Sequence, residues 1–376
     1  MNVNSQPLFI KIYRKGFKWF YHRFCHEFIH PRFALTKYFF VKVAFIRSFF
    51  KINKNTFSDL FSNDFLFVIY DLNIEAITYD FAHFIAAADT YGKLKNKNNL
   101  YVIFIQREIN PLLVDRDYTS VVSEDSQNWR FSNIVLELVQ IYPNCVGYSF
   151  FPSEMDISGL IGNKLTYPPD YNNFYKPGMD YKEIFKLLNL NVFTGFRATN
   201  QGLNYIDKWI NSNVIEKPIV TITIRQYEYD TARNSNVEEW VKFAAWAGER
   251  GYEVIFIPDT DACWIENILL DEFTVFNEPC WNLGLRMALY ERAFTNLFYA
   301  GGPSAICTLS KVARSIIFFP IIEESLQATS AIINNFGLVS GQRRYNFAKK
   351  FQCLSWRRDY FENIRDEFIE FVKLNG

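Results

Sequence analysis

The chain has 376 residues, of which 49% are hydrophobic and 21% charged, with 40 lysines and arginines against 40 aspartates and glutamates. The length predicts two domains that each bury a core, and the composition excludes a disordered or collagen-like chain. A formal net charge of zero argues against a protein whose whole surface binds nucleic acid. The six cysteines form no CxxC pair, which predicts reduced thiols and neither a disulfide framework nor a zinc site.

The first 56 residues differ from the rest, because they carry eleven basic residues, one acidic residue and fifteen aromatic residues. Large apolar side chains recur every three or four positions from Tyr13 to Phe28, which predicts an amphipathic helix over about residues 10–28. Pro31 should end this helix, and a second one is expected over about residues 33–50. We interpret residues 1–56 as a basic aromatic helical arm.

A cationic helix with aromatic side chains on one face suits an anionic membrane surface. The alternatives are that the arm packs on the rest of the protein or on a partner chain, or that it follows a single nucleic-acid strand. We expect no secretory signal, and the sequence contains no run of about 20 apolar residues. We prefer peripheral attachment to the inner face of the cytoplasmic membrane, with no nucleic-acid partner.

Residues 57–205 are expected to form an N-terminal α/β domain. Its predicted elements are strand 65–70, helix 79–94, strand 100–105, helix 131–141 and strand 146–150. Continuous apolar strands that alternate with helices are typical of a parallel sheet.

Residues 206–376 are expected to form a second α/β domain, joined to the first by a helix over residues 201–211. Its predicted elements are strand 219–225, helix 236–250, strands 252–257 and 273–276, helix 281–294, strand 296–300, helix 304–312, strand 315–319 and a C-terminal helix 359–373. The predicted fold class is therefore α/β, with two Rossmann-like doubly wound domains facing a cleft.

Ligands of such sheets bind at the carboxyl ends of the strands, so the loops there hold the candidate site. Arg225 and Arg233 lie in the loop after strand 219–225, where two guanidinium groups suit a diphosphate. Alternatively, Arg225 pairs with Glu228 or Asp230 and orders the loop.

Carboxylates follow the next strands. Asp259 and Asp261 come after strand 252–257, where they either accept sugar hydroxyls or cap a helix. The sequence Asp259-Thr260-Asp261 formally matches a DxD metal motif, but its setting in a doubly wound domain favours an accidental match, and we predict no metal. Glu278, after strand 273–276, is a further candidate hydroxyl acceptor.

The turn Gly301-Gly302-Pro303-Ser304 leads from a strand into a helix. The glycines would let the backbone approach a phosphate, with free N–H groups at Ser304 and Ala305 and the helix dipole behind them. The turn lacks the lysine and GK[ST] ending of a Walker loop and is not GxGxxG.

In the first half, Asp80 and His83 lie at the start of helix 79–94 and face the same cleft. His83 is the only histidine outside the arm, and Asp80, three positions earlier, is the acidic neighbour that a histidine base needs. The alternative is that His83 packs in the core or lies on the surface.

Two Rossmann-like halves, the strand ending in Arg225 and the GGPS turn resemble the GT-B class of nucleotide-sugar-dependent glycosyltransferases. The sequences ITIRQ and RNSN also resemble the arginine motif of its fucosyltransferase-like branch. In that branch two basic residues are usually adjacent, whereas Gln226 follows Arg225 here.

The resemblance implies a metal-independent glycosyltransferase with no tightly bound cofactor and a nucleotide-sugar donor, whose base stays open, with a GDP- or UDP-linked donor favoured. The implied acceptor is a lipid-linked or surface glycan. Two alternatives remain open at this point: a sugar-nucleotide epimerase of similar architecture, or a non-catalytic scaffold that keeps the fold.

Overall fold

The computed structural model describes residues 65–107, 121–152, 164–169, 171, 178–263, 267–299, 301–325 and 327–375. They all belong to one compact unit, Phe61–Gly376. The expected arm, residues 1–56, lies outside the described residues. Among the described residues, no helix is both long and apolar enough to cross a membrane.

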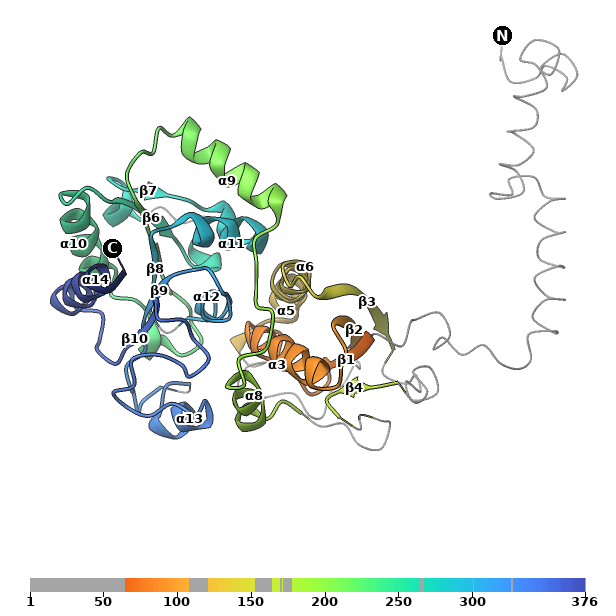
Figure 1. Ribbon diagram of the computed structural model, residues 1–376. Coiled ribbons are helices and arrows are strands. Elements are labelled where there is room, and N and C mark those ends of the chain that lie inside the picture. The colour runs from red at the N-terminus through yellow and green to blue at the C-terminus, as the bar shows by residue number, and fades with distance from the viewer. Residues whose placement is uncertain are drawn as a thin grey trace, which may run out of the picture. The chain divides into compact units, whose positions relative to one another are not determined.

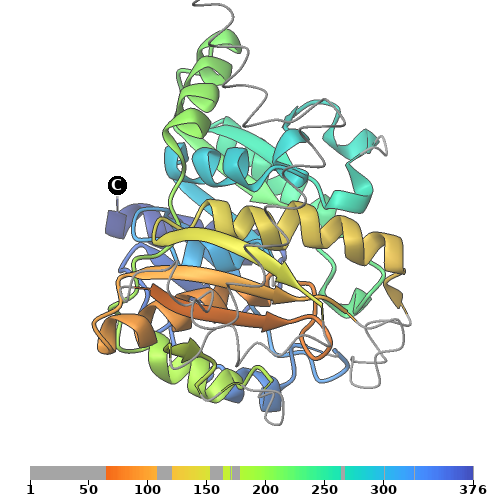
Figure 2. The same cartoon turned by 90° about the vertical axis from the view of Figure 1, so that its right-hand side faces the viewer.

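The first half of this unit forms a four-stranded parallel sheet in the order β3-β2-β1-β4, whose strands run side by side in Figure 2. Its strands are β1 (Phe65–Asp71), β2 (Asn99–Ile105), β3 (Cys145–Phe151) and β4 (Thr166–Tyr167). Strands β1 and β2 are almost completely buried, as their unbroken apolar runs predict.

The helices of this half are α3 (Asp80–Leu94), α5 (Glu124–Arg130), α6 (Leu136–Gln140) and α8 (Tyr181–Leu188). A π-helical turn, Phe131–Val135, joins α5 to α6, so this helical segment begins before the expected residue 131. Ser123 starts it, because its hydroxyl accepts a hydrogen bond from the Ser126 nitrogen. Helix α8 packs against α3.

The second half forms a six-stranded parallel sheet in the order β10-β9-β8-β5-β6-β7. Its strands are β5 (Ile219–Thr223), β6 (Glu253–Ile257), β7 (Thr274–Val275), β8 (Thr295–Tyr299), β9 (Ser315–Phe318) and β10 (Gln352–Ser355). Numbered along the chain, this is the Rossmann order 3-2-1-4-5-6.

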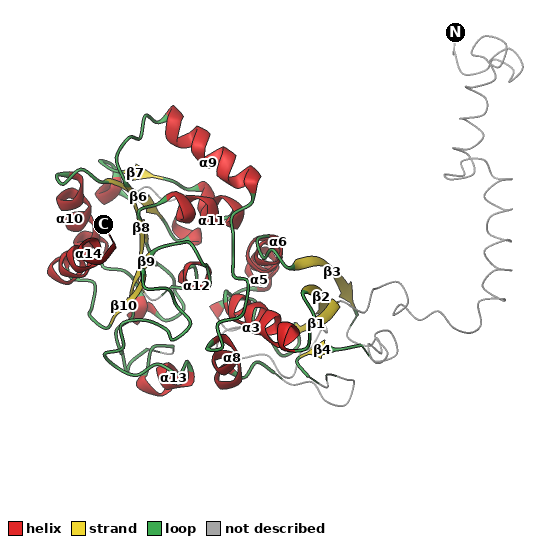
Figure 3. Cartoon of the chain, viewed as in Figure 1, coloured by secondary structure: helices red, strands yellow, loops and turns green. Residues whose placement is uncertain are grey.

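Helices cover both faces of the six-stranded sheet (Figures 1 and 3). The helices of this half are α9 (Asn200–Ser212), α10 (Val237–Gly248), α11 (Leu283–Arg292), α12 (Ser304–Thr308), α13 (Ser330–Asn335) and α14 (Phe361–Asn375). On one face α10 and α14 bury Trp240, Phe243 and Phe368, and on the other lie α11 and α12. The predicted α/β class with two Rossmann-like sheets is therefore confirmed.

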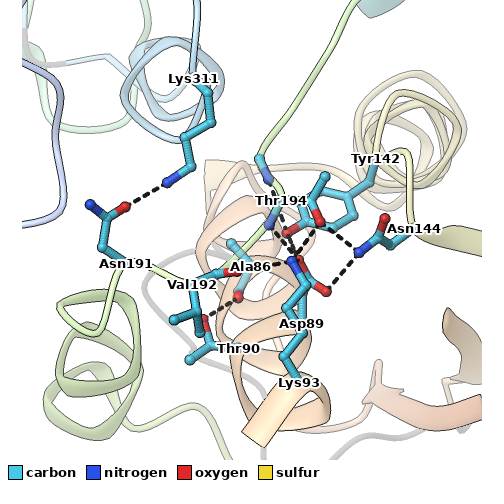
Figure 4. Close-up of polar contacts among 11 residues, drawn as sticks. Ala86, Asp89, Thr90, Lys93, Tyr142, Asn144, Asn191, Val192, Thr194 and Lys311 are labelled. Carbon is cyan, nitrogen blue, oxygen red and sulfur yellow. Dashed lines mark hydrogen bonds and ion pairs between the residues drawn. The ribbon is translucent and has the colours of Figure 1, made fainter. Parts of the chain in front are cut away.

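The segment between α8 and α9 connects the two sheets and is held from both sides. On one side the fully buried carboxylate of Asp89 accepts hydrogen bonds from the Thr194 nitrogen and from Lys93 (Figure 4). On the other side Gly195, with φ +88°, lies against the carbonyl of Leu309. That carbonyl accepts a hydrogen bond from the Phe196 nitrogen at 3.2 Å.

Candidate functional site

The strand order places a crevice at the carboxyl ends of β5 and β8. These two strands are neighbours, but the chain leaves β5 toward β6 on one side and leaves β8 toward β9 on the other. Such a switch point is where open α/β sheets bind ligands. A cavity of about 440 Å³ lies there, lined from the second half by Arg225, Arg233, Asp259, Gly301, Gly302 and Ser304 and from the first half by Asp80 and His83.

Arg225 follows β5 and is 8% exposed. Its Nη1 donates to the Asp230 carbonyl at 3.0 Å and to Asn234 Oδ1 at 2.5 Å, and its Nη2 donates to the Tyr229 carbonyl at 2.5 Å. Burial and the neighbouring Arg233 lower the pKa of Arg225 to about 10, so it remains a cation at neutral pH. The loop therefore orders around Arg225, through carbonyl and amide oxygens and not through the carboxylates that the sequence suggested.

Arg233 also lines the cavity, and Asp230 positions it. Its Nε donates to Asp230 Oδ2 at 2.6 Å, and Ser325 Oγ donates to the same oxygen at 2.7 Å. Asp230 has φ +60°, a left-handed conformation that is unfavourable for a residue with a side chain. One strained residue thus fixes both guanidinium groups, Arg225 through its carbonyl and Arg233 through its carboxylate.

Asp259 caps a short 3₁₀ helix, Thr260–Ala262, and connects two strand ends. Its Oδ1 accepts from the Thr260 nitrogen at 2.8 Å, and its Oδ2 accepts from the Gln226 nitrogen at 3.0 Å. Burial raises its pKa. The side chain of Asp261 lies outside the described atoms. Of the two alternatives for Asp259, the structure shows the helix cap, and the residue also lines the cavity.

Gly301 and Gly302 form the cavity wall after β8, but the turn differs from the expectation in two ways. Helix α12 ends at Thr308, and the expected extension to residue 312 is wrong. The N–H groups of Ser304 and Ala305 are not free, because they donate to the carbonyls of Gly301 and Gly302 at 3.1 and 3.0 Å. The turn therefore offers the ligand close approach to the backbone but not these two donors.

Gly302 also meets the first half of the chain. A Cβ atom at this position would lie 2.6 Å from Cδ2 of Tyr79, so only glycine lets the two halves approach here. Glu278 is exposed and lines neither this cavity nor a second, adjoining cavity that is described below. The structure does not bring this predicted hydroxyl acceptor to the site.

Asp80 and His83 both face the cavity from the first turn of α3. Thr78 Oγ1 donates to Asp80 Oδ2 at 2.8 Å, and Tyr181 is also hydrogen-bonded to Asp80. The His83 ring lies 5.3 Å from that of Phe185, and its Nδ1 is buried without a hydrogen-bond partner. Burial lowers the pKa of His83, so its neutral, basic form predominates at pH 7.

Two further cavity residues, Tyr79 and Arg286, were not predicted from the sequence, and Arg130, which the sequence placed near the cleft, lines the cavity with them. The guanidinium of Arg130 lies 4.6 Å from the ring centre of Tyr227, which belongs to the loop after β5. Arg286 comes from the middle of α11 and is 2% exposed. A helix interior carries no local pattern for ligand binding, so only the tertiary structure identifies Arg286. With these residues the cavity has four arginines and two aspartates.

A second cavity, of about 1070 Å³, adjoins the first and shares Ile224, Tyr227 and Pro258 with it. It lies beyond the carboxyl ends of β5, β6 and β7, where Asp271 and Asn277 contribute polar groups. Among the described residues, no group of three or more histidine, cysteine, aspartate or glutamate side chains has the geometry of a metal site.

No protein-family model and no curated protein matches the chain. Among solved structures, it is similar to a family 9 glycosyl transferase from Veillonella parvula, with 9% identity, a TM-score of 0.47, and coverage of 83% of this chain and 100% of that one. It is also similar to the dodecameric iron-containing heptosyltransferase TibC from E. coli in complex with ADP-D-beta-D-heptose (14% identity, TM-score 0.42, coverage 83% and 78%). A third is the fucosyltransferase NodZ from Bradyrhizobium (13%, 0.27, 65% and 93%).

These structures belong to the class that the sequence resembles, so the expected resemblance is confirmed as a resemblance. All three TM-scores are below 0.5. The function proposed below therefore rests on the residues of the cleft.

Proposed function

We propose that the protein is a glycosyltransferase that uses a nucleotide-sugar donor. The observation that carries the proposal is the convergence of Arg225 and Arg233 with Asp80 and His83 on one cavity at the switch point of a Rossmann sheet. Guanidinium groups suit a diphosphate, and a carboxylate or imidazole on the opposite wall suits the deprotonation of a hydroxyl.

In this proposal residues 206–376 hold the donor and residues 57–205 present the acceptor. The diphosphate lies at Arg225, Arg233 and the backbone of Gly302, and the nucleoside extends into the adjoining cavity at Asn277. That cavity is large enough for a nucleoside and combines apolar walls with a few polar groups. The GDP- or UDP-linked donor expected from the sequence has no support in the cleft, so the base stays open.

The proposed reaction breaks the bond between the anomeric carbon and the diphosphate oxygen, which keeps the electron pair. The acceptor oxygen forms the new bond to that carbon, and its proton passes to Asp80 or His83. The arginines neutralise the charge that develops on the leaving diphosphate, the role that a divalent cation has in other transferases. Asp259 is a candidate for a sugar hydroxyl.

For the acceptor we propose a lipid-linked or surface glycan, handled at the inner face of the cytoplasmic membrane. Support comes from the sequence of residues 1–56, where eleven basic residues accompany fifteen aromatic ones. Liposomes with anionic lipid should bind the full chain and should bind a variant without residues 1–56 much less. Equal binding by both would contradict the membrane role of the arm.

The transferase proposal is tested by a screen of ADP-, GDP-, UDP-, CMP- and dTDP-sugars, in which release of the nucleotide is measured. EDTA is present so that activity without a divalent cation is detected. Removal of the base should lower kcat about 10²- to 10⁴-fold, in Asp80→Asn or in His83→Gln. The exposed Asp125→Asn is the matched control. Conversion of the donor sugar without an acceptor and without nucleotide release would indicate an epimerase. Failure of every nucleotide to bind would leave a scaffold.

A further inference from the structure

Arg286 is a buried cation at the inner wall of the cleft. It lies on α11, is 2% exposed and lines the cavity together with Tyr79 and Gly302. A charged side chain is rarely buried to this extent unless an opposite charge accompanies it. Its surroundings therefore decide whether it serves the fold or a ligand.

The protein holds this guanidinium in one orientation. Arg286 Nε donates to the Pro279 carbonyl at 2.6 Å, and Nη1 donates to the Tyr290 hydroxyl at 3.2 Å. The Tyr290 hydroxyl also shares a hydrogen bond with Thr223 Oγ1, 2.9 Å away, in which either hydroxyl can donate. Thr223 is the last residue of β5, so this chain of bonds fixes Arg286 beneath the switch point.

Within the part of the chain that the structure describes, no carboxylate neutralises this charge at close range. Among the described residues, none places a carboxylate oxygen within ion-pair distance of Arg286, and none accepts a hydrogen bond from its Nη2. Glu137 is near enough for the charge of Arg286 to lower its pKa somewhat, against the larger effect of burial. The Glu137 carboxylate, however, accepts a hydrogen bond from the Leu283 nitrogen at the start of α11. By contrast, Arg292 on the same helix forms a two-pronged ion pair with Asp207.

We propose that Arg286 binds a phosphate oxygen of the ligand and completes a diphosphate site with Arg225. The two guanidinium groups reach the cavity from different elements, one from the loop after β5 and one from α11. The Tyr79 hydroxyl lies within the field of Arg286 and Arg130 and can add a neutral donor. This inference rests on the proposed function for the identity of the ligand as a nucleoside diphosphate.

The test uses inorganic pyrophosphate, which carries no base, beside ADP, GDP and UDP, with the full chain. Thermal unfolding and calorimetric titration are measured for wild type, Arg286→Met, Arg286→Lys and the control Arg292→Met. We expect Arg286→Met to weaken pyrophosphate binding about 10- to 100-fold. The affinity of Arg286→Lys for pyrophosphate should lie between those of wild type and Arg286→Met, because lysine keeps the charge but not the forked geometry of the guanidinium group. Arg292→Met should bind as wild type does.

A second readout separates a ligand-binding role from a structural one. If the buried charge serves the ligand, the unliganded protein bears the free-energy cost of burying it, and the substitution removes that cost. Arg286→Met should therefore unfold at a temperature no lower than wild type. A lower unfolding temperature, failure to fold, or unchanged pyrophosphate affinity would each overturn the inference. If pyrophosphate binding depends on Arg286 but no donor is turned over, the transferase proposal fails and the anion site stands.

Discussion

The carboxylate of Asp89 accepts a 2.6 Å hydrogen bond from the backbone nitrogen of Thr194, although 105 residues separate them. The same carboxylate accepts from Lys93, Tyr142 and Asn144. Lys93 in turn donates to the Val192 carbonyl and to Thr194 Oγ1 (Figure 4). A single buried aspartate thus ties the connection between the two sheets to α3, the helix that also carries Asp80 and His83.

Asp89→Asn tests this connection because the replacement is nearly isosteric and removes only the charge and one acceptor. We expect it to lower the free energy of unfolding by about 3 kcal/mol, since Lys93 loses its counter-charge and the amide nitrogen takes the place of an oxygen that now accepts hydrogen bonds. Urea denaturation measures the loss. The control is Glu183→Gln, in an exposed pair with Lys186, which should cost less than about 0.5 kcal/mol. Equal stability of the two variants would show that the connection does not depend on this carboxylate.

Gly195, next to Thr194, is required for two separable reasons. Its φ is +88°, and a Cβ atom there would lie 2.4 Å from the Leu309 carbonyl oxygen. Gly251 has a similar φ of +85° with nothing within 4 Å of a Cβ. Gly251→Ala should therefore cost about 1 kcal/mol from the backbone alone, and Gly195→Ala about 3 kcal/mol or more. Similar losses in chemical denaturation would mean that the contact with Leu309 adjusts freely.

Much of the cleft could be predicted from the sequence because parallel strands end at a common edge. The apolar runs identified β1, β2, β5, β6 and β8, and the loops after them carry Asp80, Arg225 and Gly302. Asp80 and Gly302 lie far apart in the sequence, yet both line one cavity together with Arg225. Topology accounts for the convergence of Arg225 and Gly302 at one edge of the six-stranded sheet, whereas Asp80 reaches the cavity from the other sheet.

What the sequence did not predict depends on tertiary contacts. Strands β4 and β10 are short, and residues such as Gln352 in β10 give no strand pattern; its side chain instead donates to the carbonyls of Cys307, Ser310 and Ala313. Arg286 sits inside a helix, where a cation usually faces solvent. The role that we propose for it rests on its burial beneath β5 and its place in the cavity wall.

Gly302→Ala should force Tyr79 away from the turn after β8. The added Cβ would lie 2.6 Å from Tyr79 Cδ2, and the ring is packed between the two halves. We expect a loss of about 2 kcal/mol in the free energy of unfolding, together with weaker pyrophosphate binding. Gly248→Ala, in α10 with nothing within 4 Å, should instead gain about 0.5 to 1 kcal/mol. A stable Gly302→Ala that binds pyrophosphate normally would show that Tyr79 yields at little cost.

Glu75, in the loop that leads to Asp80, gives the fold a pH dependence. It is buried, and burial raises its pKa to about 7. A hydrogen bond from the Met179 backbone opposes this effect, and the negative charges of Asp80 and Asp71 raise the pKa by smaller amounts. The unfolded chain ionises this carboxyl near pH 4.5 and the folded chain only near pH 7. Its contribution to stability is therefore fully present below pH 4.5 and is lost as the pH rises to about 7.

Glu75→Gln removes this ionisation and keeps an acceptor for the Met179 nitrogen. At pH 8 the variant should be more stable than wild type by about 2 to 3 kcal/mol, and at pH 4.5 the two should be nearly equal. Urea denaturation at several pH values between 4.5 and 8 measures the difference. The control Glu249→Gln, at an exposed position after α10, should leave the pH dependence of wild type unchanged. A constant difference between Glu75→Gln and wild type across this range would place the ionisation of Glu75 outside it and contradict the raised pKa.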